Sequence, residues 1–195
     1  MIESKKDLKE YIMCDALASR RENAKPSLFG DEVWKFQCLL RKREYETNTL
    51  HGIKKLFCLP MIVIDKYRFH RLSLLLNFTI PFNVVGPGFS IAHPGTIIIN
   101  PEARIGKNCR IQTGVTIGST NGSDKAPRIG DNVFLGDGCK LIGDITIADD
   151  VAIGANAVVV KSIDEPGTTW GGVPAKKISD KNSHSCLSPL IFNKD

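Results

Sequence analysis

The sequence has few of the residues that would define a metal site or a disulfide scaffold. Its 195 residues include only four histidines, and its six cysteines form no Cys-x-x-Cys pair. The ligand spacing of a zinc site is therefore missing, and free thiols in a reducing compartment are expected. Aromatic residues make up 7% of the chain and no nucleic-acid-binding motif occurs, so no nucleic acid is expected as a partner.

Long hydrophobic runs are missing as well. The strongest candidate, residues 72–85, contains Asn77 and is shorter than the roughly 20 apolar residues of a membrane span. The chain opens without the pattern of a secretory signal, so the sequence predicts a cytoplasmic protein.

Basic residues outnumber acidic ones only in the first part of the chain. Residues 1–83 hold 15 Lys and Arg against 10 Asp and Glu, whereas residues 84–195 hold 11 of each. Two interpretations of this basic segment stay open: a solvated helical face, or a surface that meets an anionic substrate or the inner face of an anionic membrane.

A repeat of six residues organises the second part of the chain. Counted in sixes from residue 99, ten of eleven positions are Ile, Leu or Val: Ile99, Ile105, Ile111, Ile117, Ile129, Leu135, Leu141, Ile147, Ile153 and Val159. This period matches neither an α-helix nor an alternating strand. It is typical of a parallel β-solenoid in which each hexad forms one side of a triangular coil, so the anchors are expected to point inward.

The eleventh position, Ser123, lies in the polar and turn-rich residues 119–127. The phase returns at Ile129, which predicts a loop that leaves the solenoid and comes back. Loops of this kind often carry function.

Helix-type patterns precede the repeat. Residues 5–23 and 31–47 are expected to be helical, residues 52–59 form a short basic segment, and residues 64–78 are expected to form an amphipathic helix. The predicted organisation is a helical cap over residues 1–83, a solenoid over 84–178, and a tail over 179–195 that is loose unless its apolar residues dock.

Four stretches resemble the hexapeptide-repeat acyltransferases, and within them the serine acetyltransferase branch: residues 91–100, 114–118, 153–159 and 171–176. The resemblance implies a mainly β fold, a left-handed parallel β-helix with a small α-helical cap. It also implies acetyl-CoA as acyl donor, no metal, and a homotrimer with sites between subunits. The hand comes from the resemblance alone, because left-handed crossovers are rare.

The resemblance marks His93 as the catalytic residue, since the matching histidine of the family is the general base. Histidine suits this role because its side chain ordinarily titrates near neutral pH. His93 lies six residues before Ile99, which places it in phase with the anchors but in an irregular first coil.

The resemblance also implies where acetyl-CoA binds, namely along solenoid edges where small residues admit its pantetheine arm. A backbone N–H near Gly118 is the candidate oxyanion donor, and two lysines match basic residues near the nucleotide phosphates. The implied set is Gly118, Ser119, Gly136, Asp137, Gly154, Ala155, Lys161 and Lys176. Asp137 departs from the small uncharged residue common in the family.

Two further departures concern the acceptor. Ala92 and Ala126 stand where serine acetyltransferases carry an aspartate and a histidine. These departures favour the colanic-acid-type branch, which acetylates a sugar hydroxyl in capsule, exopolysaccharide or O-antigen synthesis, with Asn100 and Lys125 as acceptor-binding residues. The alternative is an L-serine O-acetyltransferase of cysteine biosynthesis.

Three other classes of protein fit the sequence less well. A solenoid carbonic anhydrase needs three zinc-binding histidines, whereas the solenoid has one. A non-catalytic scaffold would not need His93 or the loop, and an antibiotic acetyltransferase of the streptogramin type places its histidine elsewhere.

Overall fold

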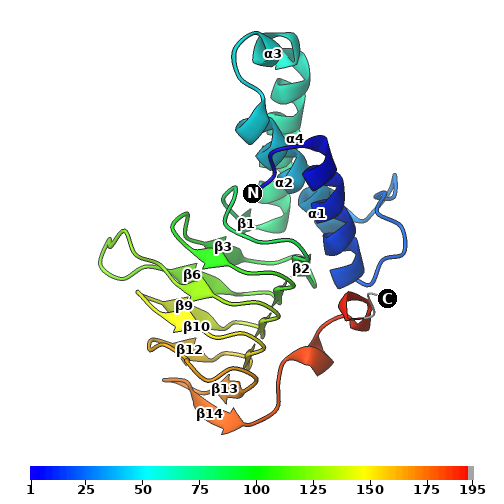
Figure 1. Cartoon of the computed structure of the whole chain (residues 1–195). Helices are drawn as coiled ribbons and strands as arrows, with labels where there is room; N and C mark the ends of the chain where they lie inside the picture. Colours follow the sequence, from blue (N-terminus) through cyan, green and yellow to red (C-terminus); the bar gives the residue numbers. More distant parts are fainter. Residues whose placement is uncertain (193–195) are drawn as a thin grey trace.

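The hexad repeat forms three parallel sheets that make up the sides of one solenoid, with four helices above it (Figure 1). The structure is a computed structural model that describes residues 1–192. The first sheet contains β1 (Phe78–Thr79), β3 (Ile97–Ile99), β6 (Thr116–Gly118), β9 (Lys140–Ile142) and β12 (Val158–Val159). The second contains β4 (Arg104–Ile105), β7 (Arg128–Ile129) and β10 (Thr146–Ile147). The third contains β2 (Ser90–Ile91), β5 (Arg110–Ile111), β8 (Phe134–Leu135), β11 (Ala152–Ile153), β13 (Thr169–Gly171) and β14 (Lys176–Ser179).

The strand register follows the predicted coil length. Ile99 pairs with Ile117, 18 residues later, and Leu141 pairs with Val159, again 18 residues later. Ile117 pairs with Leu141 at a spacing of 24, because the loop after β6 adds one hexad's length to that coil. The parallel β-helix is therefore confirmed, while its left hand stays a prediction from the resemblance.

All ten predicted anchors are buried and belong to one continuous apolar core. Small residues fill the space beside them, among them Cys109, Val133 and Cys139. Each coil has two or three residues per strand, so packing between coils stabilises the stack more than any single strand does.

One corner of the solenoid carries a ladder of amide side chains. Asn108, Asn132 and Asp150 all have a positive φ, at 56°, 57° and 60°. Asn108 Nδ2 donates to Asn132 Oδ1 at 2.8 Å, and Asn132 Nδ2 donates to Asp150 Oδ1 at 2.9 Å. Asn and Asp tolerate this left-handed conformation, and the ladder satisfies their side chains in register.

The cap consists of α1 (Lys5–Ala18), α2 (Glu32–Thr49), α3 (Gly52–Phe57) and α4 (Leu59–Leu76). Ser4 begins α1 as its N-cap, accepting from the Asp7 N–H at 3.1 Å. Two predicted bounds were wrong: α1 ends at Ala18 rather than at residue 23, and α4 begins at Leu59 rather than at residue 64. The second difference arises because Pro60 lies in the first turn of α4, where proline favours the start of a helix.

The cap is joined to the solenoid through aromatic and charged contacts. Phe36 of α2 stacks on Phe69 of α4 and meets the edge of Phe78 in β1, with both centroid distances at 5.1 Å. Phe78 pairs with Ile97, so β1 is the uppermost strand of the first sheet although it precedes residue 84.

Arg41 of α2 is fully buried at the same junction. Its guanidinium donates to Asp15 Oδ2 at 2.7 Å and to Glu44 Oε2 at 3.0 Å. It also donates to the carbonyl oxygens of Val85 at 2.9 Å and Gly86 at 2.6 Å. A single side chain therefore ties α1, α2 and the first coil together.

The tail returns along the solenoid to α1 (Figure 1) through η1 (His184–Cys186) and η2 (Pro189–Ile191). His184 Nε2 lies 2.7 Å from Asp150 Oδ1, at the end of the amide ladder, and Leu187 is buried. The tail therefore docks up to residue 192 rather than lying loose, and its last three residues lie outside the described part of the chain.

The lower end of the third sheet is closed by a reversal. Strand β14 pairs with β13 antiparallel, whereas the other named strand pairs are parallel. None of the helices within residues 1–192 is both long and apolar enough to cross a lipid bilayer.

Candidate active site

His93 lies in an enlarged corner between β2 and β3. The buried anchors Ile91 and Ile99 on either side are eight positions apart instead of six, so this corner holds two extra residues. His93 is therefore exposed, two positions after Ile91, and the prediction that it keeps the phase of the anchors was wrong. Gly95, with a φ of 140°, allows the chain to make this wider turn.

The enlarged corner is held by the end of α4. Gly95 N donates to Leu76 O at 3.2 Å, and Ile97 N donates to Asn77 O at 3.1 Å. Asn77 ends the helix in the left-handed conformation, which turns these carbonyl groups toward the corner.

The imidazole of His93 makes no hydrogen bond or ion pair with any residue among 1–192. Both of its ring nitrogens are therefore available to a ligand. Serine acetyltransferases carry an aspartate at the position of Ala92. No side chain among residues 1–192 contacts the His93 imidazole in its place.

Polar side chains occupy the equivalent position in the next two coils below this corner, and an alanine occupies it in the third. Thr113, Asp137 and Ala155 each lie two positions after an anchor that stacks below Ile91. The Thr113 hydroxyl donates to Asp137 Oδ1 at 2.9 Å, and its N–H donates to the same oxygen at 3.2 Å. Coils stack about 4.8 Å apart, so Asp137 lies roughly 10 Å below His93 and orients Thr113 rather than the imidazole.

Thr113 was not predicted from the sequence. It lies two residues after the anchor Ile111, just as His93 lies two residues after Ile91, and these two anchors pair. That equivalence becomes visible only once the two extra residues of the His93 corner are located.

The other edge of the first sheet carries the predicted acceptor-binding residues. Asn100 and Gly118 follow the paired anchors Ile99 and Ile117, and Asn100 Nδ2 donates to Ser119 Oγ at 3.2 Å. The predicted loop begins here and projects from the solenoid (Figure 1).

The loop closes next to the same edge. Lys125 Nζ lies 2.8 Å from Asp144 Oδ2, and this hydrogen bond raises the pKa of Lys125. Ala126 is already buried in the core, so the loop has re-entered the solenoid at the position where the family carries its second histidine.

The predicted site residues thus form two groups on opposite edges of the first sheet. The His93 edge holds His93, Gly136, Asp137, Gly154 and Ala155, together with Lys176, which pairs with Gly171 in β13. The Asn100 edge holds Asn100, Gly118, Ser119, Lys125 and Lys161. About six residues of extended chain, on the order of 20 Å, separate the edges, so one protomer does not bring the groups together.

Packing between coils requires glycine at one of two positions on these edges but not at the other. A Cβ on Gly136 would lie 2.8 Å from the backbone nitrogen of Ala155, so the stacking of coils requires glycine there. A Cβ on Gly118 would meet nothing nearer than Ile142 Cδ1 at 3.4 Å, an ordinary contact. Packing within the chain therefore does not explain Gly118, which leaves room for a ligand.

A hollow of about 620 Å³ lies beside the His93 corner. Ala92 and Pro94, the neighbours of His93, line it together with Arg21, Asp31 and Arg110. Burial lowers the pKa of Arg110, and the nearby Arg20 adds to this effect. Arg21 and Asp31 form an ion pair with each other, so Arg110 is the lining cation that remains available to an anionic ligand.

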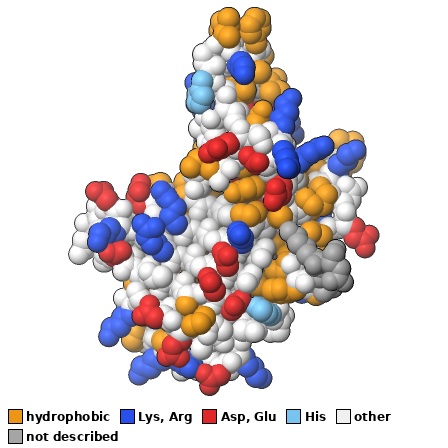
Figure 2. Space-filling model, viewed as in Figure 1, with side chains coloured by type: hydrophobic (Ala, Val, Ile, Leu, Met, Phe, Trp, Pro, Cys, Tyr) orange, Lys and Arg blue, Asp and Glu red, His pale blue; other side chains and the backbone are white. Residues whose placement is uncertain are grey.

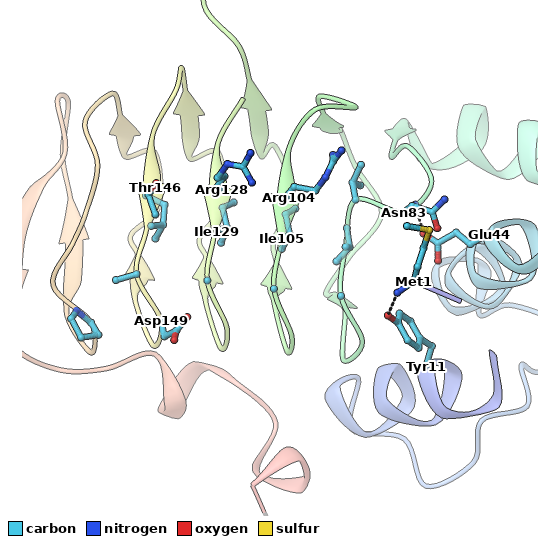
Figure 3. Close-up of a pocket in the computed structure, with 18 of the residues that line it drawn as sticks. Met1, Tyr11, Glu44, Asn83, Arg104, Ile105, Arg128, Ile129, Thr146 and Asp149 are labelled. Atoms are coloured by element: carbon cyan, nitrogen blue, oxygen red, sulfur yellow. Dashed lines mark hydrogen bonds between the residues drawn. The ribbon is translucent and has the colours of Figure 1, made fainter. Parts of the chain in front are cut away.

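A larger groove of about 750 Å³ lies on the second sheet (Figure 3). Arg104 and Arg128 line it from adjacent coils, and Met1 and Tyr11 of the cap close one end (Figure 3). It contains none of the predicted site residues, so the larger hollow is not the candidate active site.

The described residues form no candidate metal centre, and the two cysteines of the solenoid core are unsuited to act as nucleophiles. No group of three or more His, Cys, Asp or Glu within residues 1–192 could hold a metal ion. None of the six cysteines forms a disulfide, and burial raises the pKa of the Cys139 thiol to about 12. Cys109 is buried as well, and burial raises its pKa too.

Known proteins define the class of this solenoid. The family described as Bacterial transferase hexapeptide (six repeats) matches residues 126–161. Serine acetyltransferase from Brucella abortus superposes with a TM-score of 0.69 at 23% identity, covering 92% of this chain and 72% of that one. A structure from the same organism, in complex with coenzyme A, gives a TM-score of 0.63 at 25% identity, covering 90% and 67%.

Two sequence relatives narrow the class. Serine acetyltransferase from Helicobacter pylori is 34% identical over 151 residues, which are 71% of this chain and 88% of the relative. The Mycobacterium tuberculosis serine acetyltransferase is 39% identical over 100 residues, or 50% of this chain, and the match spans only 43% of that relative. The chain belongs to the serine acetyltransferase family.

These relatives contradict the prediction of a polysaccharide acetyltransferase, because the matched proteins are named serine acetyltransferase. The prediction rested on Ala92, Ala126 and Asn100 and on the short basic cap, whereas the likeness to the Helicobacter pylori protein extends over 151 residues. The findings support the alternative, serine acetylation.

Proposed function

We propose that this chain is an acetyl-CoA-dependent O-acetyltransferase whose acceptor is L-serine. The observation that carries this proposal is the 34% identity that extends over 88% of the Helicobacter pylori serine acetyltransferase. The coenzyme A complex of the Brucella abortus enzyme supports the choice of donor. The six cysteines form no disulfide, which favours a reducing compartment, and we assign the activity to the cytoplasm.

His93 acts as the general base in this proposal. A ring nitrogen takes the proton of the serine hydroxyl while the oxygen attacks the carbonyl carbon of the thioester. Collapse of the tetrahedral intermediate breaks the carbon–sulfur bond, and the imidazolium returns its proton to the leaving thiolate. The exposed, unpartnered ring of His93 suits both steps, and a backbone N–H beside Gly118 is assigned to the oxyanion.

The two separated edges require a second copy of the chain. We assign one site to the His93 edge of one protomer and the Asn100 edge of its neighbour, which gives a closed ring of three copies with three sites. Acetyl-CoA would lie between these edges, with its pantetheine arm beside Gly118 and its phosphates near Lys161 and Lys176. Lys125 and Asn100 would approach the acceptor from the neighbouring protomer.

The hollow beside His93 supplies a positive charge that matches the carboxylate of an amino-acid acceptor. Arg110 can bind the serine carboxylate, whereas Arg21 and Asp31 are already paired with each other. Arg110 would take over part of the role that Ala92 and Ala126 cannot perform.

The test is the release of coenzyme A thiol from acetyl-CoA with and without L-serine. His93→Ala should lower turnover by about 10²- to 10⁴-fold, which is the range of a general base. His70→Ala is the matched control, because His70 is exposed on α4 and makes no hydrogen bond or ion pair with residues 1–192. Thiol release that is independent of serine, or that survives in His93→Ala, would refute the proposal.

A further inference from the structure

The far end of the helical cap carries an apolar tip. It consists of α3 and the first turn of α4, and it projects away from the solenoid (Figure 1). No residue of α3 is buried. Ile53, Leu56 and Phe57 are 71%, 67% and 81% exposed, and hydrophobic side chains gather at this end of the surface (Figure 2).

The charge around the tip has one sign. Lys54 and Lys55 lie between the apolar residues of α3, and neither makes an ion pair with a described residue. No Asp or Glu occurs in residues 47–64. The first acid beyond them, Asp65, is buried and already paired with Lys42.

We propose that this tip docks on the surface of an anionic phospholipid bilayer. An amphipathic helix that combines apolar and basic side chains binds at the headgroup level, with its apolar groups in the acyl boundary. Lysines beside the apolar groups can extend their ammonium groups to the lipid phosphates. The tip has both components within one short helix.

The uniform charge distinguishes this occupant from a second copy of the chain. A two-fold contact between two tips would place Lys54 and Lys55 near the same residues of the partner, with no acid in the tip to compensate them. An anionic lipid surface provides that compensation.

A second exposed Leu-Phe pair shows that exposure alone does not make such a surface. Leu28 and Phe29 are 83% and 87% exposed, but they lie next to Asp31 and Glu32. This pair lacks the uniform positive charge of the tip and serves as its control.

The experiment is co-sedimentation of the full chain with phosphatidylcholine vesicles, with and without phosphatidylglycerol. The wild-type chain should bind the anionic vesicles, and rising salt should weaken the binding. Lys54→Gln/Lys55→Gln should lower partitioning about thirtyfold, because each basic residue near an anionic surface contributes about a fivefold gain. Lys5→Gln/Lys6→Gln, an exposed lysine pair on α1, should leave partitioning unchanged.

The apolar contribution is tested with a second pair of variants. Leu56→Ser/Phe57→Ser should lower partitioning by more than about tenfold, whereas Leu28→Ser/Phe29→Ser should not change it. Circular dichroism checks that each variant is folded.

Three results would overturn the proposal. They are equal binding to neutral and anionic vesicles, wild-type partitioning of the tip variants, and no vesicle binding at all. If sedimentation equilibrium instead shows self-association that Leu56→Ser/Phe57→Ser abolishes, without vesicle binding, the occupant is a second copy.

Discussion

Replacing Arg41 with methionine should destabilise the whole chain, because this one side chain joins the cap to the solenoid. The change leaves the buried carboxylates of Asp15 and Glu44 without their cation and the carbonyls of Val85 and Gly86 without a donor. Removing one partner of a buried ion pair costs about 3–5 kcal/mol. With a urea m-value of about 2 kcal/mol/M, the unfolding midpoint should fall by about 1.5–2.5 M.

The loss should depend on pH with a defined sign. Burial raises the pKa of Asp15, and Arg41 opposes that rise. A carboxyl whose folded pKa is raised contributes stability that is present below its unfolded value and is lost as the pH rises through the folded pKa. Without Arg41 the folded pKa of Asp15 rises further, so the variant should be closest to the wild-type stability at acid pH and furthest from it at pH 8.

The assay is urea unfolding followed by circular dichroism at pH 5 and pH 8. Arg71→Met, an exposed change on α4, should leave the free energy of unfolding within about 0.5 kcal/mol of wild type. Adding Asp15→Asn and Glu44→Gln to Arg41→Met should recover part of the loss, since both uncompensated charges are removed. A loss below about 1 kcal/mol, or one equal at both pH values, would refute the reasoning.

Three further predictions follow from packing. Gly136→Ala should lower the free energy of unfolding by about 1–3 kcal/mol, because the added Cβ meets the backbone of the next coil. Gly118→Ala should fold normally and raise the KM for acetyl-CoA. Equal stabilities of the two variants in urea unfolding would contradict this prediction. At pH 8 Cys109 and Cys139 should not react with a disulfide reagent until urea unfolds the chain, since both are buried and their pKa values are raised. Leu187→Ala should speed tryptic cleavage after Lys181 by loosening the buried docking of the tail, and an unchanged cleavage rate would count against that docking.

The solenoid could be predicted from sequence because its signal is local and repeated. Each anchor points inward for the same steric reason, so ten independent positions predict one structure. The loop after Ile117 was equally visible, since it interrupts a phase that returns at Ile129.

The site could be predicted only in part. The corner of His93 holds two extra residues, and nothing in the hexad count distinguishes an insertion from an in-phase position. The separation of His93 from Asn100 across the first sheet depends on which coil side each hexad forms, and the repeat alone does not number the sides. The Arg41 cluster joins residues far apart in sequence, for which no local pattern exists.

The reversed strand β14 has a consequence for assembly. A stack of parallel coils ends in unpaired backbone groups that could accept another chain, and repetition of that contact would produce a filament. Here the helices cover the upper end of the stack. At the lower end β14 runs antiparallel to β13, so the outermost strand of that side does not match the parallel pairing of a further coil. Lys176 adds an exposed positive charge to this outermost strand, while Lys177 is paired with Glu165 and Asp180. Growth of the solenoid is thus limited to the length that the chain itself encodes.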